Sequence, residues 1–378
     1  MTAVGRQGAA FLAIVLVAVA CTADTEEPTD GAPPTETAEP EEASEPEEAV
    51  DREPTGPEEP LGSEEVQTSE ETGPQETGPQ ETESEEATPP PEQRRGADLP
   101  TSRTEVTGTV WEGQVVAVGG LDADGNAVAD VDLYDPATDT WTAGPDLPTA
   151  RHHTAVETLG DRLVVVGGYS DAWAPQPEVW SLGPGEARWR EEPSLATPRG
   201  ALAVASTGSR LVAIGGVGPG GEVLTSIEVL ESDADAWQPG PQLDTPREHL
   251  DATAVGERVY AISGRAGGFD TNHASVEVLR DGQWRTTAPV QHPRGGIGAD
   301  TVDGRPCVAG GEEPAGTIAT IECLVDGAWA VVGELEVARH GLVVVHVDGA
   351  LHVIGGGPAP GLTVSDVHEI VPIDPSRG

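Results

Sequence analysis

The sequence predicts an all-β fold of six similar four-stranded units, because three markers recur with one period along residues 97–378. The first marker is a pair of glycines, ending at Gly120, Gly168, Gly216, Gly264, Gly311 and Gly356, in which Ser263 once replaces the first glycine. An arginine recurs with the same steps of 48, 48, 48, 47 and 45 residues, at Arg103, Arg151, Arg199, Arg247, Arg294 and Arg339. A tryptophan stands ten residues before each of the last five arginines, at Trp141, Trp189, Trp237, Trp284 and Trp329. The repeats begin near residues 97, 145, 193, 241, 289 and 334.

Each period reads as four short antiparallel strands. A strand follows the arginine, as in "HHTAVETL", and a β-branched run such as "RLVVVGG" leads into the glycines. "SVEVLRDGQW" then reads as a strand, a tight "DG" turn and a fourth strand. Such units bury their faces only against neighbours, and their length of about 47 residues is typical of a propeller blade. We therefore expect a six-bladed β-propeller.

The pattern resembles kelch repeats over residues 97–378. The resemblance rests on the apolar run into the double glycine, the aromatic residue in "VDLYDP", the tryptophan after the turn and the "PR" before the next strand. The chain departs from the pattern at Ser263 and in later repeats, where leucine or isoleucine replaces the aromatic residue. The resemblance implies six blades around a central channel.

The last repeat has no tryptophan strand of its own, so its outermost strand has to come from elsewhere. Counting back ten residues from Arg103 leads to Gln93. We therefore expect residues 93–100 to supply this strand, which makes 93–378 the propeller and removes a free sheet edge.

The first 21 residues read as a secretion signal. Arg6 precedes the apolar run at residues 9–20, which is too short to span a bilayer comfortably. "AVAC" then resembles a bacterial lipoprotein processing site, with Cys21 as the lipidated residue; ordinary secretory cleavage nearby is the alternative. The expected location is extracytoplasmic, either anchored to the membrane through Cys21 or secreted.

Residues 22–92 form a segment rich in Glu, Pro and Thr that we expect to be a disordered linker. Residues 22–96 contain 25 Asp or Glu residues and three Arg, with almost no large apolar side chains. The whole chain has a formal net charge of −46 and contains no lysine. Because phosphates would be repelled, nucleic acid is excluded as a partner.

Cys307 and Cys323 fall on adjacent strands of the fifth repeat. In a secreted protein such a pair predicts a disulfide, and two buried thiols are the alternative.

The six recurring arginines are candidate ligand-binding residues. In kelch repeats this position begins the innermost strand near the channel mouth, and a guanidinium binds carboxylates and phosphates in a bidentate manner. A ring of them could bind an anion. Alternatively, each arginine bonds backbone carbonyls or an acidic neighbour, and its recurrence in every blade favours this structural role.

Residues two and four positions after each arginine should face the channel, whereas those three positions after it should be core. The channel-facing positions are mostly small, and their polar exceptions are Glu105, His153, His249 and Asp251. His153 is a candidate for ligand binding, and His249 and Asp251 are the catalytic candidates. These four could also bind a metal. Because they come from blades 1, 2 and 4, we expect a solvated lining instead, with no metal or cofactor. Glu248 is expected at the exposed start of its strand.

The loops after the double glycines carry further candidate ligand-binding residues, namely Tyr169, Trp173, Phe269 and Asn272. Aromatic faces beside amides and carboxylates suit sugar or peptide recognition. The alternative is that these side chains pack onto their own loops.

These observations favour a membrane-tethered binding module whose partner, a protein or a glycan, docks on the face of the post-glycine loops. Within the kelch resemblance, copper chemistry like that of galactose oxidase is disfavoured, because the chain has only three tyrosines and both propeller cysteines lie in one blade. A mutarotase of an acidic sugar, working through the channel-mouth Arg and His, is the first alternative. A structural envelope lipoprotein is the second.

Overall fold

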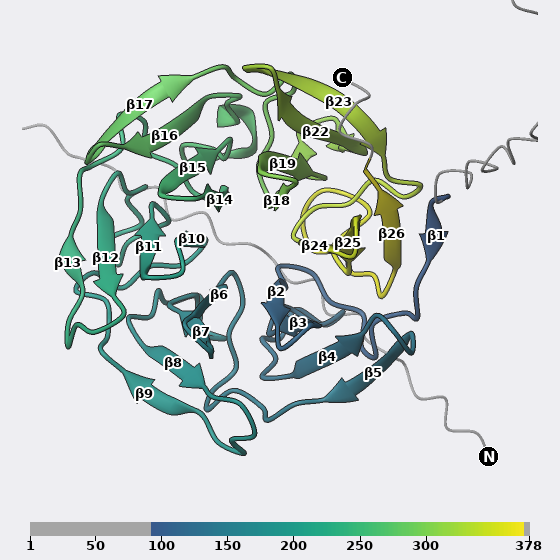
Figure 1. Cartoon of the computed structure of the whole chain (residues 1–378), viewed down its shortest axis with the longest axis horizontal. Helices are drawn as coiled ribbons and strands as arrows, with labels where there is room; N and C mark the ends of the chain where they lie inside the picture. The colour runs from purple at the N-terminus through teal and green to yellow at the C-terminus, as the bar shows by residue number, and fades with distance from the viewer. Residues whose placement is uncertain (1–91, 374–378) are drawn as a thin grey trace, which may run out of the picture. The chain divides into compact units, whose positions relative to one another are not determined.

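The computed structural model describes residues 92–373, which form six four-stranded antiparallel sheets around a central axis (Figure 1). The predicted six-bladed β-propeller is thereby confirmed. The signal segment, Cys21 and nearly all of the acidic segment lie outside the described residues. The described residues contain no helix that is long and apolar enough to cross a membrane.

Each blade runs outward from the strand nearest the axis (Figure 1). Blade 1 contains β2 (Thr107–Trp111), β3 (Gln114–Val118), β4 (Val131–Asp135) and β5 (Thr140–Ala143). Blade 2 contains β6 (Ala155–Leu159), β7 (Arg162–Val166), β8 (Val179–Leu182) and β9 (Arg190–Glu192). Blade 3 contains β10 (Ala203–Ser206), β11 (Arg210–Ile214), β12 (Ile227–Glu231) and β13 (Gln238–Pro239).

Blade 4 contains β14 (Asp251–Val255), β15 (Arg258–Ile262), β16 (Val276–Arg280) and β17 (Gln283–Thr287). Blade 5 contains β18 (Gly298–Val302), β19 (Arg305–Ala309), β22 (Thr320–Val325) and β23 (Ala328–Glu334). Blade 6 contains β24 (Val343–Val347), β25 (Ala350–Ile354), β26 (His368–Pro372) and β1 (Arg94–Arg95). Two loops carry short elements of their own, the hairpin β20 (Glu312–Glu313) with β21 (Gly316–Thr317) and the 3-10 turn η1 (Phe269–Thr271).

The ring closes between the two ends of the propeller. Strand β1 pairs antiparallel with β26, in the register Arg94 to Ile370 and Arg95 to Glu369. Leu99, just after β1, is 2% exposed and packs into the cluster between blades 6 and 1. The outermost strand of blade 6 therefore comes from the segment that the repeat register indicates.

The hydrophobic core lies between blades. Each of the six core clusters draws its side chains from two adjacent blades; one of them joins Ile214 of blade 3 to Leu250 and Val259 of blade 4. The recurring tryptophans add a polar tie to the segment that enters from the preceding blade: the Nε1–H of Trp237, for example, donates at 2.8 Å to the carbonyl of Pro193, which directly follows β9 of blade 2. A blade thus gains most of its buried area only when its neighbours are present.

The recurring arginines are buried, in line with the structural role that their recurrence favours and not with a ligand-binding ring. Five of them have a relative exposure of 0%, and Arg151 has 4%. Arg199 is representative: it donates to the carbonyls of Gly215 at 3.0 Å and Ser226 at 2.9 Å, and to Glu228 Oε1 at 2.7 Å. The other five pair in the same way with Asp132, Glu178, Glu277, Glu322 and Glu369. Each guanidinium pairs with a carboxylate of its own blade and is buried.

Blade 5 carries a disulfide. Cys307 on β19 and Cys323 on β22 are directly paired residues of neighbouring strands, and their sulfur atoms are bonded. Both side chains are buried. The bridge fastens the second strand of the blade to the third.

Candidate functional site

The residues two positions after each arginine form a closed ring at one end of the channel. All six have left-handed backbone conformations, with φ between 49° and 64°: Glu105, His153, Ala201, His249, Gly296 and Gly341. The amide of His153 donates to the carbonyl of Glu105, and this pattern continues around the ring, with distances of 2.8–3.2 Å, to Gly341. Val106 N closes it onto Gly341 O at 3.3 Å. The expected strand alternation is therefore wrong at this position, because the inner strands begin only two residues later.

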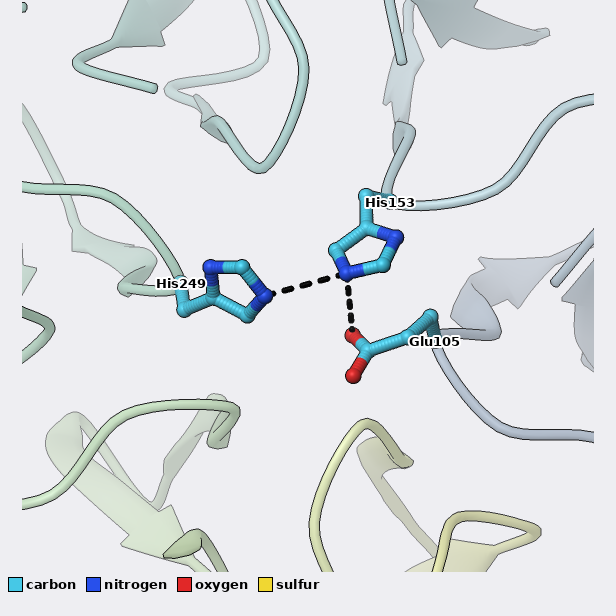
Figure 2. A group of neighbouring side chains, drawn as sticks. All are labelled: Glu105, His153 and His249. Atoms are coloured by element: carbon cyan, nitrogen blue, oxygen red, sulfur yellow. Dashed lines mark hydrogen bonds and ion pairs between the residues drawn. The ribbon is translucent and has the colours of Figure 1, made fainter. Parts of the chain in front are cut away.

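The ring brings Glu105, His153 and His249 together, although they come from blades 1, 2 and 4 (Figure 2). The Nε2 atoms of the two histidines are 3.0 Å apart, and His153 Nε2 is 3.3 Å from Glu105 Oε2. One donor atom from each residue lies within 4.8 Å of the others, which is the arrangement of a possible metal site. The expectation that these blades are too far apart is thus wrong for these three residues.

A second layer of charged side chains surrounds this trio. Arg265 lies directly after the double glycine of blade 4 and donates to Glu248 at 2.8 Å and to Glu312 at 3.0 Å. His340 Nε2 lies 3.6 Å from Glu105 and 3.5 Å from Glu312. Glu248 also pairs with His249 Nδ1. Glu248 is therefore buried, at 4% exposure, and not at the exposed strand start that the sequence predicts.

Burial shapes the ionisation of the trio. Loss of solvent lowers the pKa of His153 and of His249 well below the usual value, so both imidazoles are neutral at pH 7. Burial, together with the nearby carboxylate of Glu312, raises the pKa of Glu105 to about 8. With both imidazoles neutral, the trio contributes no positive charge at this end of the channel.

Beneath the ring lies a narrow channel cavity of about 90 Å³, lined by the inner strands. Burial raises the pKa of Glu157 to about 8 and that of Asp251 to about 7. Asp251 does not join His249 in a catalytic pair. Its carboxylate accepts hydrogen bonds from the amides of Ala252 at 2.8 Å and Ala299 at 2.7 Å. Asp251 thus fastens blade 4 to blade 5.

The candidate residues of the post-glycine loops differ in their exposure to solvent. Trp173 is 55% exposed and Phe269 is 40% exposed. Tyr169 is 7% exposed and forms a wall against His152, His153 and Trp173, with ring centroids 5.5–5.7 Å away.

Asn272 donates from Nδ2 to the carbonyl of Glu312 at 2.7 Å, which ties the loop of blade 4 to that of blade 5. Asn272 therefore stabilises the two loops, and its amide group is engaged in that contact. Phe269 is also supported from below, since the Arg265 guanidinium stacks on its ring at 4.5 Å.

The sequence interpretation missed Arg265, Glu312, Glu248, His152 and His340. Arg265 and Glu312 occupy the position after the double glycine, where other repeats have Leu121, Val217 or Gly357. The other three directly follow a recurring arginine, where other repeats have Thr104, Gly200 or Gly295. Comparing these two columns of the repeat for polar exceptions would have found them.

Three comparisons bear on the family. A model of the kelch motif matches residues 102–148. Over 50 residues the chain is 38% identical to beta-scruin of Limulus polyphemus, and this alignment covers 13% of the chain and 6% of that protein. The solved structure of YjhT superposes with a TM-score of 0.65 at 16% identity, covering 74% of this chain and 97% of that chain. At this identity the structural likeness shows the fold alone.

Proposed function

This chain is a kelch-repeat β-propeller, and we propose that it is an extracytoplasmic module that binds another protein on the face of its post-glycine loops. One observation carries the proposal. Among residues 92–373 four large apolar side chains are exposed, and three of them, Trp173, Phe269 and Leu362, lie on these loops. Exposed aromatic and aliphatic side chains gathered on one face are typical of an interaction surface.

The charges of this face indicate the kind of partner. The same loops carry exposed acidic residues, at Asp124, Asp171, Glu222, Asp270 and Glu313, whereas their one cation, Arg265, is buried and paired. The best complement is a protein segment whose apolar side chains are flanked by basic residues. The nearly closed mouth supports a protein surface over a small ligand, since the side chains of Glu105 and His249 are each 12% exposed.

Site-specific cross-linking tests this proposal. A photoreactive residue at position 173 should capture a defined partner in the producing cells, and one at position 331, on the outer strand β23, should not. The purified partner should then bind the Trp173→Ala variant roughly 30-fold more weakly, as for an anchor worth about 2 kcal/mol. Val331→Ala is the matched control and should bind normally. Equal cross-linking at both positions, or glycan binding that depends on Trp173, would overturn the protein-binding proposal.

We also propose that the propeller is tethered to the membrane through lipidated Cys21 and the segment 22–92. The support is the "AVAC" sequence and the disulfide in blade 5, which suits an oxidising compartment. Lipid labelling of the wild-type chain, lost in Cys21→Ser, tests it; unlabelled wild-type protein would refute it.

A mutarotase of an acidic sugar remains the second candidate, because Glu105, His153 and His249 converge at the mouth. The pairing of Arg265 with two carboxylates weighs against it, since this guanidinium is occupied before any sugar carboxylate arrives. Proton NMR of sialic acid anomerisation, with wild type and His249→Ala, distinguishes this activity from binding alone.

A further inference from the structure

We propose that Glu105, His153 and His249 bind one divalent transition-metal ion of the zinc class at the mouth of the channel. The ligand atoms are His153 Nε2, His249 Nε2 and a carboxylate oxygen of Glu105 (Figure 2). This inference is independent of the docking face, because it rests on buried side chains and not on the exposed loop residues.

The contacts of His152 decide which ring nitrogen of His153 carries the proton. His152 Nε2 lies 3.2 Å from the carbonyl of Ser170, which only accepts, so this nitrogen carries the proton and His152 Nδ1 is a lone pair. His152 Nδ1 lies against His153 Nδ1, which must then be the donor of that hydrogen bond. It follows that His153 Nε2 is a lone pair.

His249 likewise has an acceptor beside its Nδ1. Its Nδ1 lies against the carboxylate of Glu248, and because an ionised carboxylate only accepts, this neighbour favours the tautomer with the proton on Nδ1. Its Nε2 is then also a lone pair. Two imidazole nitrogens with lone pairs and the carboxyl group of Glu105 consequently face one another. A cation between them would satisfy all three.

Two of the three separations fit a single ion directly. For bonds of about 2.1 Å, ligand atoms lie about 3.0 Å apart at an angle of 90° and about 3.4 Å apart at the tetrahedral angle. Two observed separations match these values: 3.0 Å between the two Nε2 atoms and 3.3 Å from His153 to Glu105. The third pair, His249 and Glu105, lies within 4.8 Å, so these two side chains have to approach each other when an ion binds. Glu248 contacts Nδ1 of His249, and His152 contacts Nδ1 of His153. Metal-ligating histidines commonly have such a partner on the ring nitrogen that does not bind the metal.

The charge of the buried cluster supports the same conclusion. Glu105, Glu248 and Glu312 contribute three carboxylates, and Arg265 contributes one guanidinium. Arg265 pairs with Glu248 and Glu312, whereas Glu105 has, among the described residues, only imidazoles beside it. A cation held between the three ligands is the counter-charge that Glu105 otherwise lacks.

The donor set selects the class of metal. Two imidazoles and one carboxylate suit Zn²⁺ and its neighbours in the first transition row, whereas Ca²⁺ and Mg²⁺ prefer oxygen ligands throughout. Three protein ligands leave at least one coordination position for water or a ligand atom, and all three residues line the channel cavity. The proposed site therefore keeps a coordination position that the protein does not fill.

Zinc titration of the full chain, without a histidine tag and after removal of metals by a chelator, tests the proposal. We expect one Zn²⁺ per chain, and Co²⁺ substitution should give visible bands that report nitrogen and oxygen ligands. His249→Ala should weaken Zn²⁺ binding more than about 100-fold, and Glu248→Gln about 10- to 100-fold. His352→Ala, which removes a buried histidine of blade 6 that hydrogen-bonds His368 at 2.9 Å, is the matched control and should bind as wild type.

Circular dichroism checks that each variant is folded. If His249→Ala does not fold, X-ray absorption of the zinc-loaded wild-type chain replaces it, with two imidazole ligands as the expected result. Absence of stoichiometric Zn²⁺ binding by the wild-type chain, equal affinity of folded His249→Ala, or a spectrum without imidazole ligands would each overturn the proposal.

Discussion

At the scale of single residues, Arg247 shows what a recurring polar residue does in this fold. Its guanidinium is completely buried and donates to Ser263 O at 2.8 Å, Ser275 O at 3.0 Å and Glu277 Oε1 at 2.7 Å. Glu277 in turn accepts from the amide of Asp244 at 2.8 Å. The pair therefore connects the start of the inner strand, the double-glycine turn and the third strand of blade 4.

Replacing Arg247 by alanine should destabilise the propeller by about 3–5 kcal/mol, because it leaves Glu277 as an unpaired buried charge. Urea unfolding followed by tryptophan fluorescence measures this loss. Adding Glu277→Gln should recover part of it, since the charge is then gone. Arg285→Ala, on the exposed side of β17, is the matched control and should stay within about 0.5 kcal/mol of wild type. An equal effect of both arginine substitutions would contradict the structural role.

Glu157 gives the channel a pH dependence. Burial, with Asp300 and Asp251 as further negative neighbours, raises its pKa from 4.5 to about 8. The folded state then holds this proton more tightly than the unfolded chain does. The contribution to stability is full below about pH 4.5 and is lost as the pH rises toward 8.

We therefore expect the free energy of unfolding to fall between pH 6 and pH 8, and to fall less steeply in Glu157→Gln. The difference between the two slopes should be at most about 1.4 kcal/mol per pH unit, the limit for one proton. Urea titrations at several pH values measure both slopes. Identical slopes would show that Glu157 does not carry this proton.

At the scale of the elements, the disulfide of blade 5 closes a loop with a sequence separation of 16 residues. Its removal in a Cys307→Ala, Cys323→Ala variant should cost about 3 kcal/mol by the loop-closure argument. The melting temperature measures this, and dithiothreitol should lower it for wild type alone. A reductant effect of the same size on the double variant would assign the loss to something other than the bridge.

The elements also show where reasoning from sequence reaches its limit. The strands and the outermost strand from residues 93–100 were predictable, since apolar alternation and the repeat period specify them. The left-handed backbone at Glu105, His153 and His249 was not, because these residue types give no sign of it. Gly296 and Gly341 at the same position of later repeats were the available hint, as glycine adopts positive φ without strain.

At the scale of the whole molecule, the candidate site is a product of ring closure. Glu105, His153 and His249 are separated by whole blades in sequence and meet only because the ring of backbone hydrogen bonds draws all six inner strands to one point. Composition and period predict such a ring, but they do not give its radius. For this reason the three residues could be proposed as channel-facing from the sequence, whereas their contact could not.

Closure itself is the last property to test. Strand β1 covers the edge of β26, Gln93 Nε2 donates to Glu369 Oε2 at 3.0 Å, and Leu99 fills the cluster between blades 6 and 1. Deleting residues 92–100 should lower the melting temperature and leave β26 as an open edge that pairs between molecules. Calorimetry and light scattering measure the two effects, and an equally long deletion within residues 22–91 is the control. Because the mouth of the channel depends on the closed ring of blades, the same deletion should also weaken zinc binding. An unchanged melting temperature would mean that the ring closes without β1.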